Sequence, residues 1–409
     1  MKKVATRALL WILSLLAKAT LEQYRPRIVA ITGSVGKTTA KEMTAWVLSS
    51  NFRVGKNPDN ANTEWGVVAT IINPDFTPTI VDDGRAKITA RQALELIGTG
   101  FKNMVFQTIS YPQVLVLELA ADRPGDITWF NRLMRYDVVV VTNVGQVHLE
   151  FYDDQAHLRN EKLSLIKGLR KDGLLIINEN LRRYIPTGGS FRQQTFAEPA
   201  YDFENGQARY SFTTDAGEVR ISNRHTRAMA LSAPIAAQIA LELGINLTAI
   251  SNKISNFKSL RGRFNVDRLK RGIILINDAY NANPDSVRVA LLGLQDIAKG
   301  VDELSSAKPR RRRVAILGGM RELGEAYEQA HHEIGRFASD KADLFILIGE
   351  EGRLMADTIV GNAAKVIQTE NITADEILKH LRDNDIVLIK ASKAIGLDKL
   401  AEDLKNKLS

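Results

Sequence analysis

Residues 28–39 read IVAITGSVGKTT, a short β-branched run followed by a glycine-containing turn and the start of a helical pattern. This order predicts a strand, a phosphate-binding loop and a helix. The loop departs from the full pattern G-x-x-x-x-G-K-[ST], because Ile31 replaces its first glycine. Gly33 and Gly36 still let backbone N–H groups approach phosphate oxygens, and the helix presents its positive end to them. We therefore expect this loop to bind a nucleotide.

Side chains of the loop and of a later strand fit a nucleotide with magnesium. Lys37 can reach the outer phosphates, and Thr38 offers a hydroxyl to Mg²⁺. Glu118 follows the apolar run 114–117, at the strand end where open α/β sheets bind ligands. We predict that Glu118 is a magnesium ligand, although without the loop a helix cap or a surface ion pair would be the simpler reading.

Further apolar runs extend the first unit. The runs 114–117, 138–141 and 174–177 predict buried strands of a mainly parallel sheet with helices on both faces. Residues 182–224 are polar and glycine-rich with short alternating pieces, which predicts antiparallel hairpins. The helical pattern over 228–243 ends at Gly244, a natural helix stop.

A second strand-helix series predicts another doubly wound, Rossmann-like unit. Its strands are expected at 273–276, 314–317, 344–348 and 386–389. We place the boundary near Arg263, which divides the α/β chain into an N-terminal apolar helix (1–27), a central ATP-binding domain (28–262) and a C-terminal domain (263–409). The basic run 308–313 is expected to be a solvated loop, with contact to a phosphate or an anionic surface as the minor alternative.

Composition limits the class of protein. The chain has 409 residues and no cysteine, which excludes disulfide scaffolds, cysteine nucleophiles and cysteine-ligated zinc and suits a reducing compartment. Lysine and arginine exceed aspartate and glutamate by 55 − 47 = 8, a mild excess that favours anionic partners without choosing among them.

The amino terminus leaves two readings open. Its uninterrupted apolar part, residues 8–16, is shorter than the ~20 residues of a spanning helix, so we expect no transmembrane helix. We also expect no export, because Arg7 interrupts the signal-like start and the nucleotide motif that follows needs cytosolic ATP. Residues 4–21 either pack on the first domain or rest on the inner face of the membrane as a peripheral contact, helped by Lys2, Lys3, Arg7 and Lys18. Packing is slightly favoured, because an interfacial helix should show a cleaner polar face.

Polar residues follow other predicted strands. Asn143 and His148 come after the run 138–141, so they are expected on the same rim as Glu118. The segment 278–284 follows the run 273–276, and Pro284 can open the next helix. Taken alone, this segment is an asparagine-rich turn, and Lys162 is a solvated helix charge.

Together these residues resemble the Mur ligase family, and within it the MurF branch. The blocks that carry the resemblance are residues 32–39, Glu118 with 124–127, 142–148, 260–263, 278–284, 317–325 and 385–392. The resemblance implies ATP-dependent amide formation in cell-wall precursor synthesis: a carboxylate takes the γ-phosphoryl group, and an amine then displaces phosphate from the acyl phosphate. It also implies that Thr38, Glu118, His148 and a carbamylated Lys162 hold magnesium.

The same resemblance assigns the other site residues. Lys37, Lys162, Arg263 and His148 would be catalytic, with Arg263 near the phosphates and Asn143 and Asn281 near the base. The ATP-binding set is Gly33, Ser34, Gly36, Lys37, Thr38, Thr39, Asn143, Asn281 and Arg263. The C-terminal domain would bring substrate-binding residues when the domains close, namely Asp278, Asn283, Lys390 and Ser392.

The sequence also departs from the family pattern. Only 27 residues precede the phosphate-loop strand, where MurF enzymes carry a UDP-sugar-binding domain, so a donor without UDP is one expectation. Gly319 replaces an aspartate, Ala391 a glycine and Met229 an asparagine expected to contact the base, and Thr226 stands after His225 where the family has His-Asn. These changes concern the acceptor amine and the adenine, not the phosphoryl machinery.

The leading hypothesis is a cytoplasmic, monomeric ligase that uses ATP and Mg²⁺ to join a muramyl-peptide-like precursor to an amino acid or dipeptide, without nucleic acid. One alternative is a Mur-type ligase for a different glycan or a γ-linked peptide. Another is a nucleotide-binding regulatory protein without ligation, against which the joint presence of Lys37, Glu118, His148, Lys162 and Arg263 argues.

Overall fold

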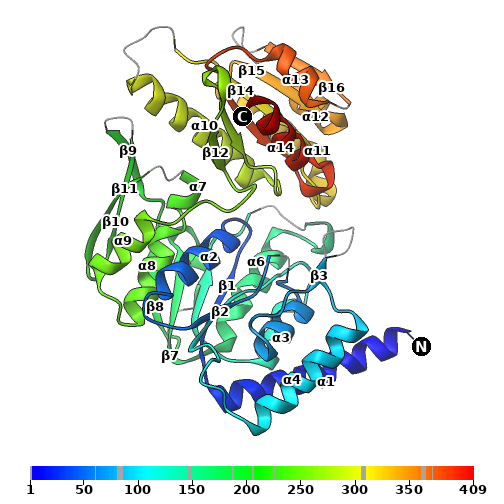
Figure 1. Cartoon of the computed structure of the whole chain (residues 1–409), viewed down its shortest axis with the longest axis vertical. Coiled ribbons are helices and arrows are strands. Elements are labelled where there is room, and N and C mark those ends of the chain that lie inside the picture. Colours follow the sequence, from blue (N-terminus) through cyan, green and yellow to red (C-terminus); the bar gives the residue numbers. More distant parts are fainter. Residues whose placement is uncertain are drawn as a thin grey trace.

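The computed structural model describes residues 2–59, 61–80, 86–145, 149–186, 188–204, 207–223, 227–304, 310–360, 365–370 and 372–409. It consists of a larger central unit and a C-terminal unit stacked along the long axis of the molecule (Figure 1). Each unit is built on a six-stranded sheet. The phosphate loop lies between the two units, at the end of the central sheet that faces the C-terminal one (Figure 1).

The central sheet is parallel throughout, as predicted, with the order β2-β5-β1-β6-β7-β8. Its strands are β1 (Arg27–Thr32), β2 (Val54–Lys56), β5 (Val114–Glu118), β6 (Tyr136–Val141), β7 (Leu169–Asn178) and β8 (Arg192–Phe196). The middle strands have continuous apolar sequences because helices bury both faces of the sheet. This topology places the carboxyl ends of β1, β5 and β6 side by side.

The region after β7 only partly matches its prediction. Antiparallel pairing is confirmed for β9 (Ala200–Glu204), β10 (Gln207–Thr214) and β11 (Gly217–Asn223), but β8 joins the parallel sheet instead. The predicted helix over 228–243 is divided into α7 (Arg227–Ala230) and α8 (Ala233–Glu242). Pro234 lies in the first turn of α8, where its missing N–H costs no helical hydrogen bond. Gly244 has a φ of 83° and ends the helix, as predicted.

Helices α2 (Lys37–Leu48) and α8 cover one face of the central sheet. The other face carries α1 (Lys2–Tyr24), α3 (Glu64–Ile72), α4 (Ala90–Val105) and α5 (Asp126–Leu133). The remaining elements of this unit are β3 (Thr79–Ile80), β4 (Ala86–Lys87), α6 (Gln155–Leu163) and α9 (Leu247–Ser255).

Helix α1 packs on the central unit, as the favoured reading of the amino terminus predicted. Leu13, Leu16 and Ala17 are buried against α3 and α4. The helix is longer than its apolar run: from Val4 to Tyr24 it is long and apolar enough to cross a membrane by length and composition alone. Part of this apolar sequence, namely Leu13, Leu16 and Ala17, belongs to the hydrophobic core of the central unit.

The C-terminal sheet has the order β12-β13-β17-β14-β15-β16, and only β12 is antiparallel to its neighbour. Its strands are β12 (Asn265–Arg268), β13 (Ile274–Asn277), β14 (Arg313–Leu317), β15 (Leu344–Ile348), β16 (Lys365–Thr369) and β17 (Ile386–Lys390). Its helices are α10 (Pro284–Leu304), α11 (Tyr327–Ala338), α12 (Gly349–Ala356), α13 (Ala374–His380) and α14 (Leu397–Leu408). The predicted strands are confirmed, whereas the edge strands β12 and β16 were missed because polar residues interrupt their apolar sequence.

In the basic run, Arg310 lies exposed in a loop, as predicted, whereas Arg312 and Arg313 are held by ion pairs. Arg312 donates to both carboxylate oxygens of Asp385, at 3.0 and 2.6 Å, and Asp385 is buried. Arg313 begins β14 and pairs with Asp343 at 3.0 Å. These bonds join strand ends of the C-terminal sheet, so the prediction was wrong for Arg312 and Arg313; residues 308 and 309 lie outside the described residues.

Candidate active site

The phosphate loop follows β1 and is fixed by the end of β6. Gly33 has a φ of 143°, and a Cβ there would lie 2.0 Å from Thr142 Oγ1, so only glycine fits. The Asn143 Oδ1 accepts hydrogen bonds from the backbone N–H groups of Ser34 and Val35, at 3.1 and 2.7 Å. Gly36 (φ 81°) begins α2. Contacts with Thr142 and Asn143 therefore hold the loop backbone in this conformation.

Side chains from three segments converge beside this loop. Lys37 Nζ donates to the carbonyl of Gly33 at 2.7 Å. Thr38 Oγ1 donates to Glu118 Oε2 at 2.7 Å and accepts from Arg263 Nη2 at 3.0 Å. The arrangement brings together the loop, the end of β5 and the entry to the C-terminal unit.

Glu118 is buried, and this cost alone would raise its pKa. The nearby cations Lys41, Lys37 and Arg263, with the Thr38 hydroxyl, instead hold the pKa below its ordinary value. Glu118 is therefore ionised at neutral pH, and its second oxygen accepts from Asn62 Nδ2 at 3.1 Å.

The donor set fits magnesium nucleotide. A hydroxyl and an ionised carboxylate are the oxygen ligands that Mg²⁺ takes in phosphate sites, where it keeps few protein ligands. Within the described residues, no group of three or more His, Asp or Glu side chains forms a complete metal cage. That arrangement suits an ion held by a few protein ligands and by phosphate oxygens.

Lys162 is not the solvated helix charge that its local sequence suggests. It lies on α6 with 1% of its surface exposed, and its Nζ is 3.4 Å from the carbonyl oxygen of Gly33. Burial, reinforced by Lys37, lowers the pKa of Lys162 to about 7. A large fraction of this amine is therefore neutral and nucleophilic at neutral pH.

The C-terminal unit contributes residues at the ends of β13 and β17. Lys390 Nζ donates to Asp278 Oδ2 at 2.6 Å and to the carbonyl of Asn281 at 2.9 Å. The Ser392 Oγ is buried and has no hydrogen-bond partner within the described part of the chain. An orphaned hydroxyl of this kind is open to a ligand.

Two asparagines in this turn have local structural roles. Asn283 Oδ1 accepts from the backbone N–H of Ser286 at 2.9 Å, which caps α10. Asn281 Oδ1 accepts from the N–H of Ala282 at 2.9 Å. The asparagine-rich turn expected from the segment alone is therefore present.

The two units also meet at the start of α10. Asn143 Nδ2 donates to Asp285 Oδ2 at 3.3 Å, and a Cβ on Gly145 would lie 1.8 Å from that same oxygen. Arg263 stacks on Tyr280, with its guanidinium carbon 4.1 Å from the ring centre. His148 lies outside the described residues, so its predicted role remains a prediction.

Sequence reasoning missed the residues that hold Glu118 in place. Lys41 is fully buried, and its Nζ donates to the carbonyl of Asn57 at 2.6 Å. The Asn57 side chain in turn bonds the backbone N–H and carbonyl of Glu118, at 2.8 and 2.9 Å. Lys41 stands one helical turn after Lys37 and was detectable by that spacing, whereas Asn57 and Asn62 lie in a loop without a recognisable pattern.

The glycine at position 319, which departs from the family pattern, lies against the side chain of Glu351. A Cβ on Gly319 would lie 2.6 Å from the carboxyl carbon of Glu351, which comes from α12. Glu351 is buried and pairs with Arg321 Nη2 at 2.9 Å. A carboxylate from another element thus fills the space beside position 319. Met229 is buried in the core of the central unit, and His225 and Thr226 lie outside the described residues.

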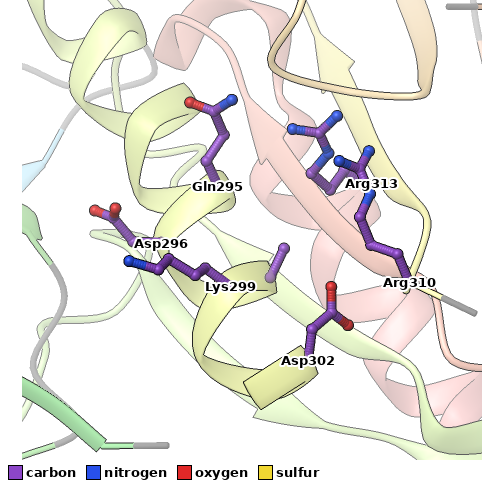
Figure 2. Close-up of a pocket in the computed structure, with 7 residues that line it drawn as sticks. Gln295, Asp296, Lys299, Asp302, Arg310 and Arg313 are labelled. Carbon is purple, nitrogen blue, oxygen red and sulfur yellow. The ribbon is translucent and has the colours of Figure 1, made fainter. Parts of the chain in front are cut away.

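A separate hollow of about 520 Å³ lies between α10 and the start of β14 (Figure 2). Its lining consists of Gln295, Asp296, Ala298, Lys299, Asp302, Arg310 and Arg313. Arg310 and Arg313 both pair with Asp343, at 2.7 and 3.0 Å, and Asp296 pairs with Arg227 at 2.8 Å. None of the predicted site residues lines this hollow, and Asp296, Arg310 and Arg313 there are already engaged in ion pairs.

Comparison with known families matches both units. Residues 31–225 match the Mur ligase middle domain, and residues 262–393 match the Mur ligase, glutamate ligase domain.

Three known proteins illustrate the similarity. The UDP-N-acetylmuramoyl-tripeptide–D-alanyl-D-alanine ligase of Bacillus subtilis (strain 168) is 26% identical over 95% of this chain and 78% of its own length. The ligase of the same name from Mycobacterium leprae (strain TN) is 28% identical over 92% of this chain and 73% of its own length. The crystal structure of MurF ligase from Thermotoga maritima in complex with ADP superposes with a TM-score of 0.77, covering 97% of this chain and 84% of that one at 23% identity, which establishes the fold.

Proposed function

The chain belongs to the Mur ligase family, and we propose that it is an ATP-dependent, ADP-forming ligase of peptidoglycan synthesis that adds D-alanyl-D-alanine or a similar amino compound to a muramyl peptide. The observation that carries this proposal is the convergence of Lys37, Thr38, Glu118 and Arg263 on one phosphate loop. Phosphoryl transfer needs such a cluster, because catalysis consists mainly of positioning and of neutralising phosphate charge.

The residues of the central domain suit activation of the donor carboxylate. Lys37 would exchange the Gly33 carbonyl for the outer phosphates, and the backbone N–H groups of the loop would bind phosphate oxygens. Thr38 and Glu118 would hold Mg²⁺, which when bound offsets charge on the transferring phosphoryl group. Arg263 would add a second cation to the phosphates, and His148 a further metal ligand.

Lys162 is proposed to be carbamylated. A buried amine with a pKa of about 7 is neutral often enough for its nitrogen to attack CO₂. The nitrogen then releases a proton to solvent, and the product is an anionic carbamate. That anion would face Lys37 across the Gly33 carbonyl and act as a metal-side ligand. Two ammonium groups this close together repel each other. Conversion of Lys162 to an anion replaces that repulsion by attraction to Lys37.

The C-terminal domain is proposed to complete the site. Asp278, Asn283, Lys390 and Ser392 are the candidate substrate residues, and the unpartnered Ser392 hydroxyl supports this most directly. Asn143 and Asn281 are proposed near the nucleotide base. With domains at 28–262 and 263–409, closure would exclude water from an acyl phosphate that water would otherwise hydrolyse.

The test combines the purified full chain with ATP, Mg²⁺, D-alanyl-D-alanine and a muramyl tripeptide, offered both with and without UDP. Released ADP and newly formed amide are measured together. ADP and amide in equal amounts support the proposal. ADP without amide would point instead to another acceptor, which the altered surroundings of Gly319 favour. Nucleotide binding with neither product would indicate a regulatory protein without ligation.

A further inference from the structure

Large apolar side chains are exposed on the outer side of α1 and α4. We call this surface the outer face and define it by Trp11, Ile12, Leu15, Leu94, Phe101 and Val105. Trp11 is 65% exposed, Leu94 71% and Val105 70%. Single exposed apolar residues are ordinary, but a group of this kind on neighbouring helices marks an interaction site.

Helices α1 and α4 pack against each other, so their exposed apolar residues belong to one region of the surface. A Cβ on Gly100 would lie 2.8 Å from the Leu16 Cβ, and Asn103 Nδ2 is 3.4 Å from the Thr20 hydroxyl. Leu15 and Phe101 adjoin Leu16 and Gly100 in the sequence, and both are exposed. The two helices lie at the edge of the molecule farthest from the C-terminal unit (Figure 1).

The charges around the outer face are mainly positive. Arg7, Lys18 and Lys102 are exposed on the same helices. These helices contain two acidic residues, Glu22 and Glu95. Glu95 pairs with Arg91 at 3.1 Å, so Glu22 is the acidic residue that offsets the three cations. A second copy of the chain, packed by two-fold symmetry, would bring cations against cations. An anionic lipid surface complements both the apolar face and its basic surroundings.

We propose that the outer face docks the protein on an anionic lipid surface, with α1 lying along the interface. Crossing of the membrane by α1 would remove Leu13, Leu16 and Ala17 from the core of the central unit. The same helix therefore serves both readings of the amino terminus, because its inner face packs and its outer face binds lipid. The docking is independent of the proposed ligase activity, because α1 and α4 lie at the end of the central unit away from the phosphate loop (Figure 1).

The test is co-sedimentation of the full chain with vesicles of phosphatidylcholine alone or mixed with phosphatidylglycerol. We expect binding to the anionic vesicles that weakens as salt rises. The double variant Trp11→Ser, Phe101→Ser should bind about tenfold more weakly or worse, since it removes two large inserted side chains. Its matched control is Val266→Ser, Val360→Ser, which alters exposed apolar residues of the C-terminal unit and should bind normally.

A charge variant keeps the proposal testable if the first variant folds poorly. Lys18→Glu, Lys102→Glu reverses the charge of two of the three exposed cations, and both side chains are exposed. This variant should also weaken binding to anionic vesicles. ATP affinity should be unchanged in every variant. The proposal is overturned if the full chain does not sediment with anionic vesicles. It is also overturned if the C-terminal control loses as much binding as the outer-face variant. It is also overturned if light scattering finds a dimer that the outer-face variant separates.

Discussion

The two halves of the candidate site are built differently. On the central side, the loop backbone, Thr38, Glu118 and Lys162 all have protein partners that fix their positions. On the C-terminal side, the Ser392 hydroxyl has no partner within the described residues, and the space beside Gly319 is filled by Glu351. The residues proposed for phosphoryl transfer are thus already held in position, whereas the proposed substrate side has an unpartnered hydroxyl and the departure at Gly319. Substitutions on the two sides should therefore fail in different ways.

The largest effect is expected on the central side, from Lys37→Ala. The variant should fold, but its transition-state free energy should rise by about 3 kcal/mol or more, which removes nearly all turnover. The reason is the loss of a cation that would contact the phosphates. The measurement is ADP release at saturating ATP. Lys167→Ala, which removes an exposed lysine of the same unit, should behave as wild type. Near-normal turnover in Lys37→Ala would remove the phosphate loop from the mechanism.

Lys162→Ala should also be inactive, but a small carboxylate such as acetate should restore part of the activity by replacing the carbamate. A lysine with a merely structural role would give no such rescue.

The protonation of Lys162 also predicts a pH-dependent stability. Its folded pKa of about 7 lies below the unfolded value of 10.5, so between these pH values the unfolded state binds more protons and stability rises with pH. In CO₂-free buffer, Lys162→Met should therefore gain most over wild type below pH 7, and this advantage should shrink toward pH 10. Urea denaturation across this range is the measurement, and a difference that does not vary with pH would contradict the assignment.

An intermediate effect is expected on the C-terminal side from Gly319→Asp. The new carboxylate would be forced against Glu351, and we expect a loss of about 3 kcal/mol in unfolding free energy. Adding Glu351→Ala should recover most of it, because one carboxylate then occupies the space. Additive effects in this double-mutant cycle would show that the two positions do not share a site.

The smallest effect is expected from Ser392→Ala. Because the hydroxyl has no protein partner in the described residues, stability should change little. If the hydroxyl binds substrate, the KM for the acceptor or the donor should rise by about tenfold or less, while ATP affinity stays the same. A change in ATP affinity alone would assign Ser392 to the central half and weaken the contrast between the halves.

The same contrast explains what could be predicted from the sequence. The loop, β1 and Glu118 follow from short local patterns, because a phosphate site at the end of parallel strands needs neighbouring residues in a fixed order. Lys162 is buried with its Nζ beside the carbonyl oxygen of Gly33, which is far from it in sequence. The pairings of Arg312 with Asp385 and of Glu351 with the space at Gly319 likewise join distant segments. Local patterns carry no signal for such contacts.

Arg263 stands where the chain enters the C-terminal unit, and it donates to the same Thr38 oxygen that magnesium would coordinate. A magnesium ion held by that oxygen would repel the guanidinium and so weaken the hydrogen bond from Arg263 to Thr38. Metal loading would therefore release Arg263 from Thr38 toward the phosphates. The junction between the domains would then sense whether the nucleotide has arrived, and the order of events would follow from competition for a single hydroxyl.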